Sequence, residues 1–149
     1  MDAMIVSYNL RVYGLLILDN RVLLTDEYRA GMIMTKFPGG GLEKGEGLAD
    51  CLIREFEEEL AISIEVGKLY YVNEFLQVSA FDSSQQLISF YYIVETKERD
   101  LIPTPIELTE LKVNEQRFRW VNLNDLDPTT FTFPIDQKVA ELLRCFQKK

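Results

Sequence analysis

Three glutamates near the middle of the chain, Glu55, Glu58 and Glu59, have the spacing that places side chains on one face of a helix. At about 100° per residue, positions i, i+3 and i+4 of a helix lie side by side. Hard divalent ions such as Mg²⁺ and Mn²⁺ prefer oxygen ligands, and neighbouring carboxylates can hold such an ion beside water and phosphate oxygens. The spacing therefore predicts a site for Mg²⁺, with Mn²⁺ as an alternative. The competing interpretation is an acidic helix face that is solvated or paired with Lys and Arg.

A glycine-rich loop precedes the glutamates and favours the metal site. Five glycines lie within nine positions from Gly39 to Gly47. Without a Cβ, glycine lets the backbone approach a ligand closely, so that a main-chain carbonyl of the loop can join the metal ligands. A long tight turn would also use these glycines, and the two interpretations are compatible.

The loop and the helix together resemble a known signature. Gly40, five residues, Glu46, seven residues and then the run from Arg54 to Ile62 are similar to the Nudix box. That box has Gly, Glu, Arg-Glu, an apolar residue, Glu-Glu, Gly and a final apolar residue at fixed spacing. It covers 23 residues here, and the Phe37-Pro38 lead-in and the strand with Arg119-Trp120-Val121 extend the resemblance across most of the chain.

One position departs from the box, because Ala61 stands where glycine is usual. Alanine disfavours the left-handed conformation that a glycine would adopt at the end of a helix. We therefore expect the exit from the helix to differ slightly, while the predicted ligands are unaffected.

The resemblance implies a fold and an activity. It implies an α/β (α+β) fold, a Nudix-like α/β/α sandwich with a mixed β-sheet. It also implies Mg²⁺-dependent hydrolysis of the diphosphate linkage in a small nucleoside diphosphate derivative. By position, Glu55, Glu58 and Glu59 would bind the divalent ions and the carbonyl of Gly39 would contribute. Arg54, with Glu46, would brace the loop against the helix and orient the ligands, because a bidentate Arg-carboxylate pair is geometrically demanding.

The other site residues are less closely specified. The general base should be a carboxylate near the attacking water, either Glu58 or a distal residue, for which Glu115 is the first choice and Glu107 and Glu110 are alternatives in the same segment. Glu43 and Glu57 are expected in solvent.

Substrate binding should use residues outside the box. Aromatic rings can stack on a nucleobase and arginine can pair with phosphate, so Arg29, Tyr91 and Phe133 are candidate substrate-binding residues. Most aromatic residues at strand spacing are nevertheless expected in the core.

The surrounding pattern predicts the elements that position these residues. Two apolar runs flank Asp19-Asn20 and predict a tight hairpin, and residues 31–37 predict another strand. An amphipathic pattern without Pro or Gly predicts a helix over Leu48–Leu60. A second, longer hairpin is expected from residues 63–81 and 86–97, then a loop over 99–114, a strand over 116–123 and a closing helix from 134. This order predicts a mixed sheet with helices on both faces.

Composition bounds the class of protein. The 149 residues, 47% hydrophobic, suit a single domain over 1–149. A net charge of −8 argues against a DNA or RNA polymer as partner, and the absence of histidine excludes histidine triads, dyads and His-ligated zinc. Lacking a long apolar run and a recognisable signal peptide, the chain is expected to be cytoplasmic without a membrane partner. Cys51 and Cys145 are expected as reduced thiols.

Two other functions remain open, together with the oligomeric state. The domain could be a catalytically silent nucleotide sensor that acts on a protein partner. It could also resemble the branch that isomerises prenyl diphosphates, which needs a reactive cysteine, and Cys51 lies inside the box helix, a poor position for that role. A homodimer is expected, since exposed β-hairpins can supply an interface.

Overall fold

The computed structural model describes residues 4–105 and 110–146. Its strands are β1 (Ser7–Leu18), β2 (Arg21–Arg29), β3 (Met32–Lys36), β4 (Gly39–Gly41), β5 (Glu65–Val72), β6 (Gln85–Glu95) and β7 (Gln116–Asn122). The helices are α1 (Leu48–Leu60) and α2 (Pro134–Leu143), with short 3₁₀ turns at Arg99–Leu101, Leu123–Asp125 and Pro128–Thr130. Neither α-helix of the described part is long and apolar enough to span a membrane.

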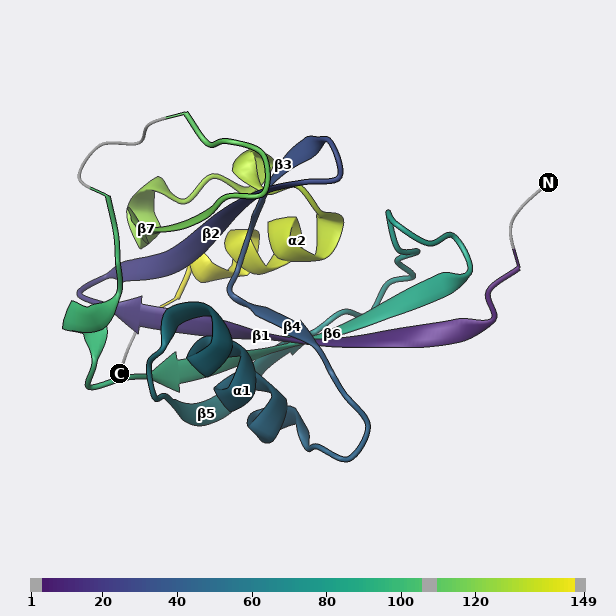
Figure 1. Cartoon of the computed structure of the whole chain (residues 1–149), viewed down its shortest axis with the longest axis horizontal. Coiled ribbons are helices and arrows are strands. Elements are labelled where there is room, and N and C mark those ends of the chain that lie inside the picture. Colours follow the sequence, from purple (N-terminus) through teal and green to yellow (C-terminus); the bar gives the residue numbers. More distant parts are fainter. Residues whose placement is uncertain (1–3, 106–109, 147–149) are drawn as a thin grey trace.

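The strands form one mixed sheet in the order β3-β2-β1-β6-β5, with β4 paired to β1 and β7 paired to β2. β1 and β6 run parallel from Ser7↔Gln85 to Leu16↔Val94, and the other strand pairs are antiparallel. In Figure 1 the first part of β1 and of β6 projects from the body as a two-stranded arm. The expected α+β architecture with a mixed sheet is therefore confirmed.

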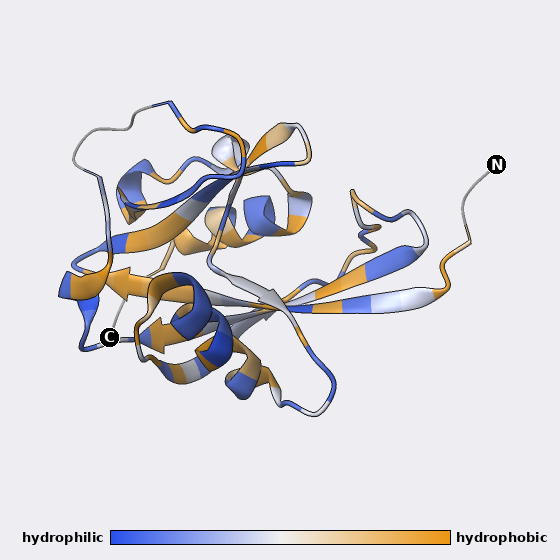
Figure 2. Cartoon of the chain, in the orientation of Figure 1, coloured by the Kyte–Doolittle hydropathy of each residue, from blue (hydrophilic) through white to orange (hydrophobic). Residues whose placement is uncertain are grey.

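The two helices cover the two faces of the sheet. α1 buries Cys51, Leu52 and Phe56 against a cluster that includes Leu16 and Leu23. On the other face, α2 packs in a cluster in which Ile135, Val139 and Leu143 meet Leu15 and Leu24. Figure 2 shows long hydrophobic runs on β1 and β2, whereas α1 alternates between hydrophobic and hydrophilic residues as an amphipathic helix does. The acidic face of α1 is thus left for chemistry.

The predicted hairpin turn and the predicted bounds of the first helix agree with the structure. The hairpin between β1 and β2 turns on Asp19 and Asn20, with φ of 51° and 61°, as a two-residue turn with two positive φ angles requires. α1 begins and ends at the predicted residues, Leu48 and Leu60.

Two other expectations need correction. The strand expected over residues 63–81 ends at Val72, and the segment that follows pairs with β6 only through the bridge Val78↔Gln86. Asn73 takes over part of the pairing, because its side chain donates to Leu87 O and accepts from Ser89 N. At the end of α1, Ala61 adopts the left-handed conformation (φ 54°, ψ 36°) and its N–H donates to Glu57 O. Alanine thus takes the conformation expected of glycine, and the helix exit is unchanged.

Candidate active site

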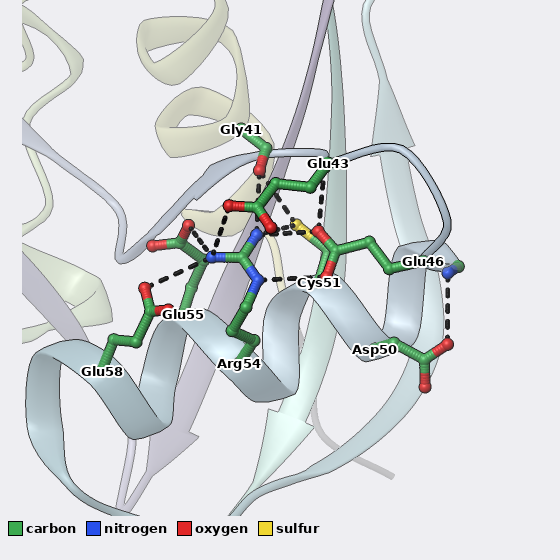
Figure 3. A network of polar contacts seen from close by, with 9 residues as sticks. Gly41, Glu43, Glu46, Asp50, Cys51, Arg54, Glu55 and Glu58 are labelled. Carbon is green, nitrogen blue, oxygen red and sulfur yellow. Dashed lines mark hydrogen bonds and ion pairs between the residues drawn. The ribbon is translucent and has the colours of Figure 1, made fainter.

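Arg54 ties the glycine-rich loop to α1. Its Nε and Nη2 donate to the two carboxylate oxygens of Glu46 at 3.0 and 2.7 Å, and Nη2 also donates to Gly41 O at 3.1 Å. Glu46 Oε1 in turn accepts from the backbone N–H of Glu43 at 2.9 Å. The Arg54 guanidinium lowers the pKa of Glu46 to about 2, so Glu46 stays ionised. Figure 3 shows Arg54 at the centre of these contacts.

The same guanidinium holds two of the predicted metal ligands. Arg54 Nη1 donates to Glu55 Oε1 at 2.9 Å and to Glu58 Oε2 at 3.3 Å, and Glu43 lies farther away at 3.8 Å. Each of these two ligand carboxylates therefore has one oxygen directed to Arg54 and one oxygen outside that contact. With these contacts Arg54 would orient both carboxylates, the role predicted for it from the sequence.

Close backbone approach explains two glycines of the loop. A Cβ on Gly40 would lie about 2.5 Å from the Glu55 carboxylate, and a Cβ on Gly39 would overlap Val12 O. β4 pairs Gly39 with Tyr13 and Gly40 with Val12 of β1. The loop is thus pressed between β1 and the Glu55 side chain, and larger residues would displace the carboxylate.

The donor set suits a divalent cation. Burial and, next, the charge of Glu55 raise the pKa of Glu59 to about 7, so these carboxylates lie in a partly desolvated place where negative charges repel each other. An added cation would relieve that repulsion. In the described residues, however, no three acidic or cysteine side chains are already spaced as a metal cluster. Glu55 and Glu58 each direct one carboxylate oxygen to Arg54 instead, so joint ligation would require their side chains to rotate.

A cavity of about 370 Å³ contains all three predicted substrate-binding residues. Its walls come from β1, the β2–β3 hairpin, the segment 77–81, β6 and the start of α2. Arg29 is mostly exposed at 61%, and Phe133 lies with its ring 6.1 Å from that of Phe81. Tyr91 is buried and stacks on Tyr13 at 5.1 Å. The volume and the aromatic lining are typical of a small-molecule site.

Asp136 is a cavity residue that the sequence reasoning missed. It is only 3% exposed, and its Oδ1 accepts a hydrogen bond from the Tyr91 hydroxyl at 2.6 Å. Burial raises the pKa of Asp136 to about 7. A signal was present in the sequence, because an acidic residue falls on the apolar stripe of the closing helix beside Ile135 and Val139. Three charged residues, Arg11, Glu27 and Lys36, also line the cavity without having been predicted from the sequence.

The other candidate bases lie elsewhere. Glu115 is exposed just before β7 and lines a separate hollow with Glu110 and Arg117. Glu107 lies outside the described residues. Glu57 is exposed on α1, as expected.

Cys51 is held as a neutral, buried thiol although Arg54 Nη2 donates to its sulfur at 3.7 Å. Its side chain is fully buried and donates to Gly41 O at 3.5 Å, and burial raises the pKa of the thiol to about 12. The thiol therefore stays neutral and enclosed.

Known proteins share both the sequence pattern and the fold. The family model of the NUDIX domain matches residues 8–143. Nucleoside diphosphate-linked moiety X motif 6 of Mus musculus and that of Homo sapiens are each 30% identical over 124 residues, which is 83% of this chain but 37% and 36% of the two relatives. The chain thus spans little more than a third of the length of these relatives.

Solved structures agree. The solution structure of the E. coli ORF135 protein has a TM-score of 0.68 at 19% identity, covering 93% of this chain and 90% of that one. The NMR structure of the DNA mismatch repair protein MutT, family Nudix hydrolase, from methicillin resistant Staphylococcus aureus 252 has a TM-score of 0.62 at 26% identity, covering 95% and 98%. With a box whose arginine, glutamates and close-packed glycines are assembled as described above, the chain belongs to the Nudix family.

Proposed function

We propose that this domain is a Mg²⁺-dependent pyrophosphohydrolase that cleaves the diphosphate linkage of a small nucleoside diphosphate derivative. One observation carries the proposal: Arg54 holds the carboxylates of Glu55 and Glu58 on α1, beside Glu59. The charges of Lys36, Glu27 and Arg29, which all line a cavity of a size that holds a small organic group, act on Glu59. The names of the curated relatives, which describe a moiety linked to a nucleoside diphosphate, support the substrate class.

Glu55, Glu58 and Glu59, with the Gly39 carbonyl, would hold Mg²⁺ or Mn²⁺. When bound, such an ion neutralises phosphate oxygens and lowers the pKa of a coordinated water. Arg54 keeps Glu55 and Glu58 together near the loop, and Glu46 holds Arg54. Of the candidate bases, Glu58 is better supported than Glu115 or Glu110, because both of these line a separate hollow.

The cavity would receive the group attached to the diphosphate. Tyr91, Tyr13 and Phe133 offer aromatic surface, and Asp136 offers a buried carboxyl at the bottom. Arg29, at the exposed rim, would contact the charged part of the substrate. These roles follow from the residues that line the cavity. The charge of Lys36, one of them, acts on Glu59 of α1 as well as on Asp136, so the cavity is electrostatically coupled to the predicted metal site.

The test is turnover of a panel of nucleoside diphosphate derivatives with Mg²⁺, followed by mass analysis of the products. Hydrolysis in H₂¹⁸O should place one labelled oxygen in one of the two phosphate products. Glu58→Gln should lower kcat by about 100-fold or more, because it removes a carboxylate needed for metal and water. Glu57→Gln is the matched control on the exposed side of the same helix and should leave kcat unchanged.

Three outcomes are separated by mass. Hydrolysis adds water, an isomerase conserves mass, and a sensor returns the ligand intact. Absence of turnover for every panel member, with unchanged Mn²⁺ binding in Glu58→Gln, would contradict the proposed activity. We also propose that the domain is a homodimer, which is tested separately below.

A further inference from the structure

A buried ion pair lies in the wall of the cavity. Glu27 of β2 is 4% exposed, and its Oε2 lies 2.7 Å from Lys36 Nζ, while its Oε1 lies 3.3 Å from Arg29 Nε. A buried carboxylate is costly unless it is paired, so the ion pair between Glu27 and Lys36 is favoured over its separation. The ion pair in turn fixes the position of the Lys36 ammonium group. The ammonium has three N–H donors, and Glu27 cannot engage all of them.

Lys36 acts electrostatically on two acidic parts of the site. It is the last residue of β3, three residues before Gly39, and its side chain is 16% exposed. Its positive charge lowers the pKa of Glu59 on α1 and also that of Asp136 on α2. The ammonium group therefore influences both a predicted metal ligand on α1 and the buried carboxyl of Asp136 in the cavity.

Arg11 of β1 is a second cationic residue in the lining of the cavity. Its Nε donates to the Tyr13 hydroxyl at 2.7 Å, and its guanidinium carbon lies 5.7 Å from the centre of the Tyr13 ring. The charges of Glu55 and Asp136 both act on Arg11. A Cβ on Gly41 would lie 3.5 Å from Nη1, so the guanidinium reaches toward the glycine loop.

We propose that Arg11 and Lys36 bind the substrate's diphosphate where it passes from the cavity to the carboxylates of α1, and that Glu27 is the positioning residue for Lys36. This inference rests on the proposed function and adds the groups that recognise the phosphates. Arg11 comes from β1 and Lys36 from β3, and they would offer the phosphates a planar guanidinium and a point charge.

The negative charge of the protein explains why a diphosphate site would need the two cations Arg11 and Lys36. The protein carries a net charge of −8, and the cavity itself contains Glu27 and Asp136. A diphosphate entering such a site is repelled unless fixed cations meet it. If Lys36 served only to neutralise Glu27, its removal together with Glu27 would leave phosphate binding unchanged, and this difference can be measured.

The experiment compares binding of nucleosides and nucleoside diphosphates. Titration calorimetry with ADP, GDP, CDP and UDP is carried out in EDTA and again with Ca²⁺ in place of Mg²⁺. Lys36→Met should weaken binding of the diphosphate by at least about tenfold, and Arg11→Met likewise, because each removes a charge-assisted contact. Binding of the corresponding nucleoside should change less than about twofold, and Lys36→Arg should restore most of the lost affinity.

Matched variants guard against a folding effect. Lys36→Met leaves the buried Glu27 carboxylate without its nearest partner. The double variant Glu27→Gln/Lys36→Met is therefore compared with Glu27→Gln. Neither of these two variants contains the Glu27 carboxylate, so they differ only in Lys36. Lys138→Met on α2, with a side chain 43% exposed, controls for loss of a positive charge elsewhere.

The outcomes distinguish this inference from the proposed activity. Equal diphosphate affinity in Glu27→Gln/Lys36→Met and Glu27→Gln overturns the role of Lys36, and failure of the wild type to bind any of the four diphosphates in either condition overturns the pair. Failure of hydrolysis with intact, Lys36-dependent diphosphate binding would refute the activity alone.

Discussion

Arg54 makes contacts that a lysine cannot reproduce. Its planar guanidinium engages Glu46 with two nitrogens while a third reaches Glu55 and Glu58. Lysine is a point charge without this fork. In Arg54→Lys the ligand carboxylates should lose their fixed orientation, and Mn²⁺ affinity should fall by about 10-fold to 100-fold, the usual effect of losing a group that orients metal ligands. Calorimetric titration with Mn²⁺ measures this.

The control for Arg54 is Arg144→Lys, an exposed arginine just after α2. It should bind Mn²⁺ as the wild type does. If Arg54→Lys retained wild-type Mn²⁺ affinity, the orienting role assigned to the guanidinium would be wrong.

Asp136 should make folding stability depend on pH. Its pKa is raised to about 7 by burial, against roughly 3.9 in an unfolded chain, and the charged or titratable groups acting on it are Tyr91, Lys36, Arg11 and Tyr13. Between these two values the folded state holds a proton that the unfolded state has released, so this group's contribution to stability falls as pH rises from about 4 to about 7 and is constant above.

Asp136→Asn isolates that contribution. Asparagine can still accept the Tyr91 hydroxyl but does not titrate, so the variant should gain stability relative to the wild type by roughly 4 kcal/mol between pH 4 and pH 8. Urea unfolding at a series of pH values measures the difference, and Asp125→Asn, at an exposed position, should show no such trend. A difference that does not change with pH would refute the buried, protonated Asp136.

At the scale of elements, α1 ends under backbone strain that a single substitution can relieve. Ala61 has φ of 54°, where a Cβ costs about 1–2 kcal/mol relative to glycine. Ala61→Gly should raise the free energy of unfolding by about 1 kcal/mol and Tm by about 2–4 °C. Ala49→Gly, near the other end of the same helix, should change stability in the opposite direction because its conformation is helical. Thermal unfolding followed by circular dichroism compares the two, and a destabilised Ala61→Gly would contradict the argument.

Elements with strong local signals were predictable. Asp19-Asn20 tolerate positive φ and α1 has a clear apolar period, so both the turn and the helix bounds follow from neighbouring residues alone. The end of β5 was not predictable, because it depends on the Asn73 side chain bonding to Leu87 and Ser89 of another strand. Local propensity contains no information on such a long-range replacement of backbone pairing.

At the scale of the whole molecule, the box and the cavity differ in how far the sequence could predict them. The Arg54 contacts join residues of one loop and one helix, so their spacing reveals them. The cavity gathers Arg11, Lys36, Tyr91 and Asp136 from four elements spread along the chain. Their proximity results from the parallel pairing of β1 with β6 and from packing of α2 on that face, and the charge pairing within the cavity appears only once the sheet is assembled.

The two-stranded arm leaves apolar surface in solvent. Met4, Val6 and Tyr8 are 78%, 70% and 67% exposed, Tyr8 near the start of β1 and the other two just before it. Within the arm β1 pairs with β6 along one edge. On its other edge, β1 is paired with β4 only from Arg11 onward, with one further backbone bond from Leu42 N to Leu10 O. Exposed apolar residues at the start of a strand with an open edge favour association with another chain.

The proposed homodimer should therefore depend on this arm. Val6→Lys/Tyr8→Lys places two charges in this exposed apolar segment, where association with a second copy would bury them, and should convert a dimer into a monomer in sedimentation equilibrium. Val113→Lys, which also replaces an apolar residue 63% exposed but lies before β7, should remain a dimer. A monomeric wild type would refute the dimer itself, whereas a dimer that persists in the arm variant would place the interface on another surface. Because Asn9 and Arg11 of the same strand line the cavity, diphosphate affinity measured on the monomeric variant would also show whether association shapes the substrate site.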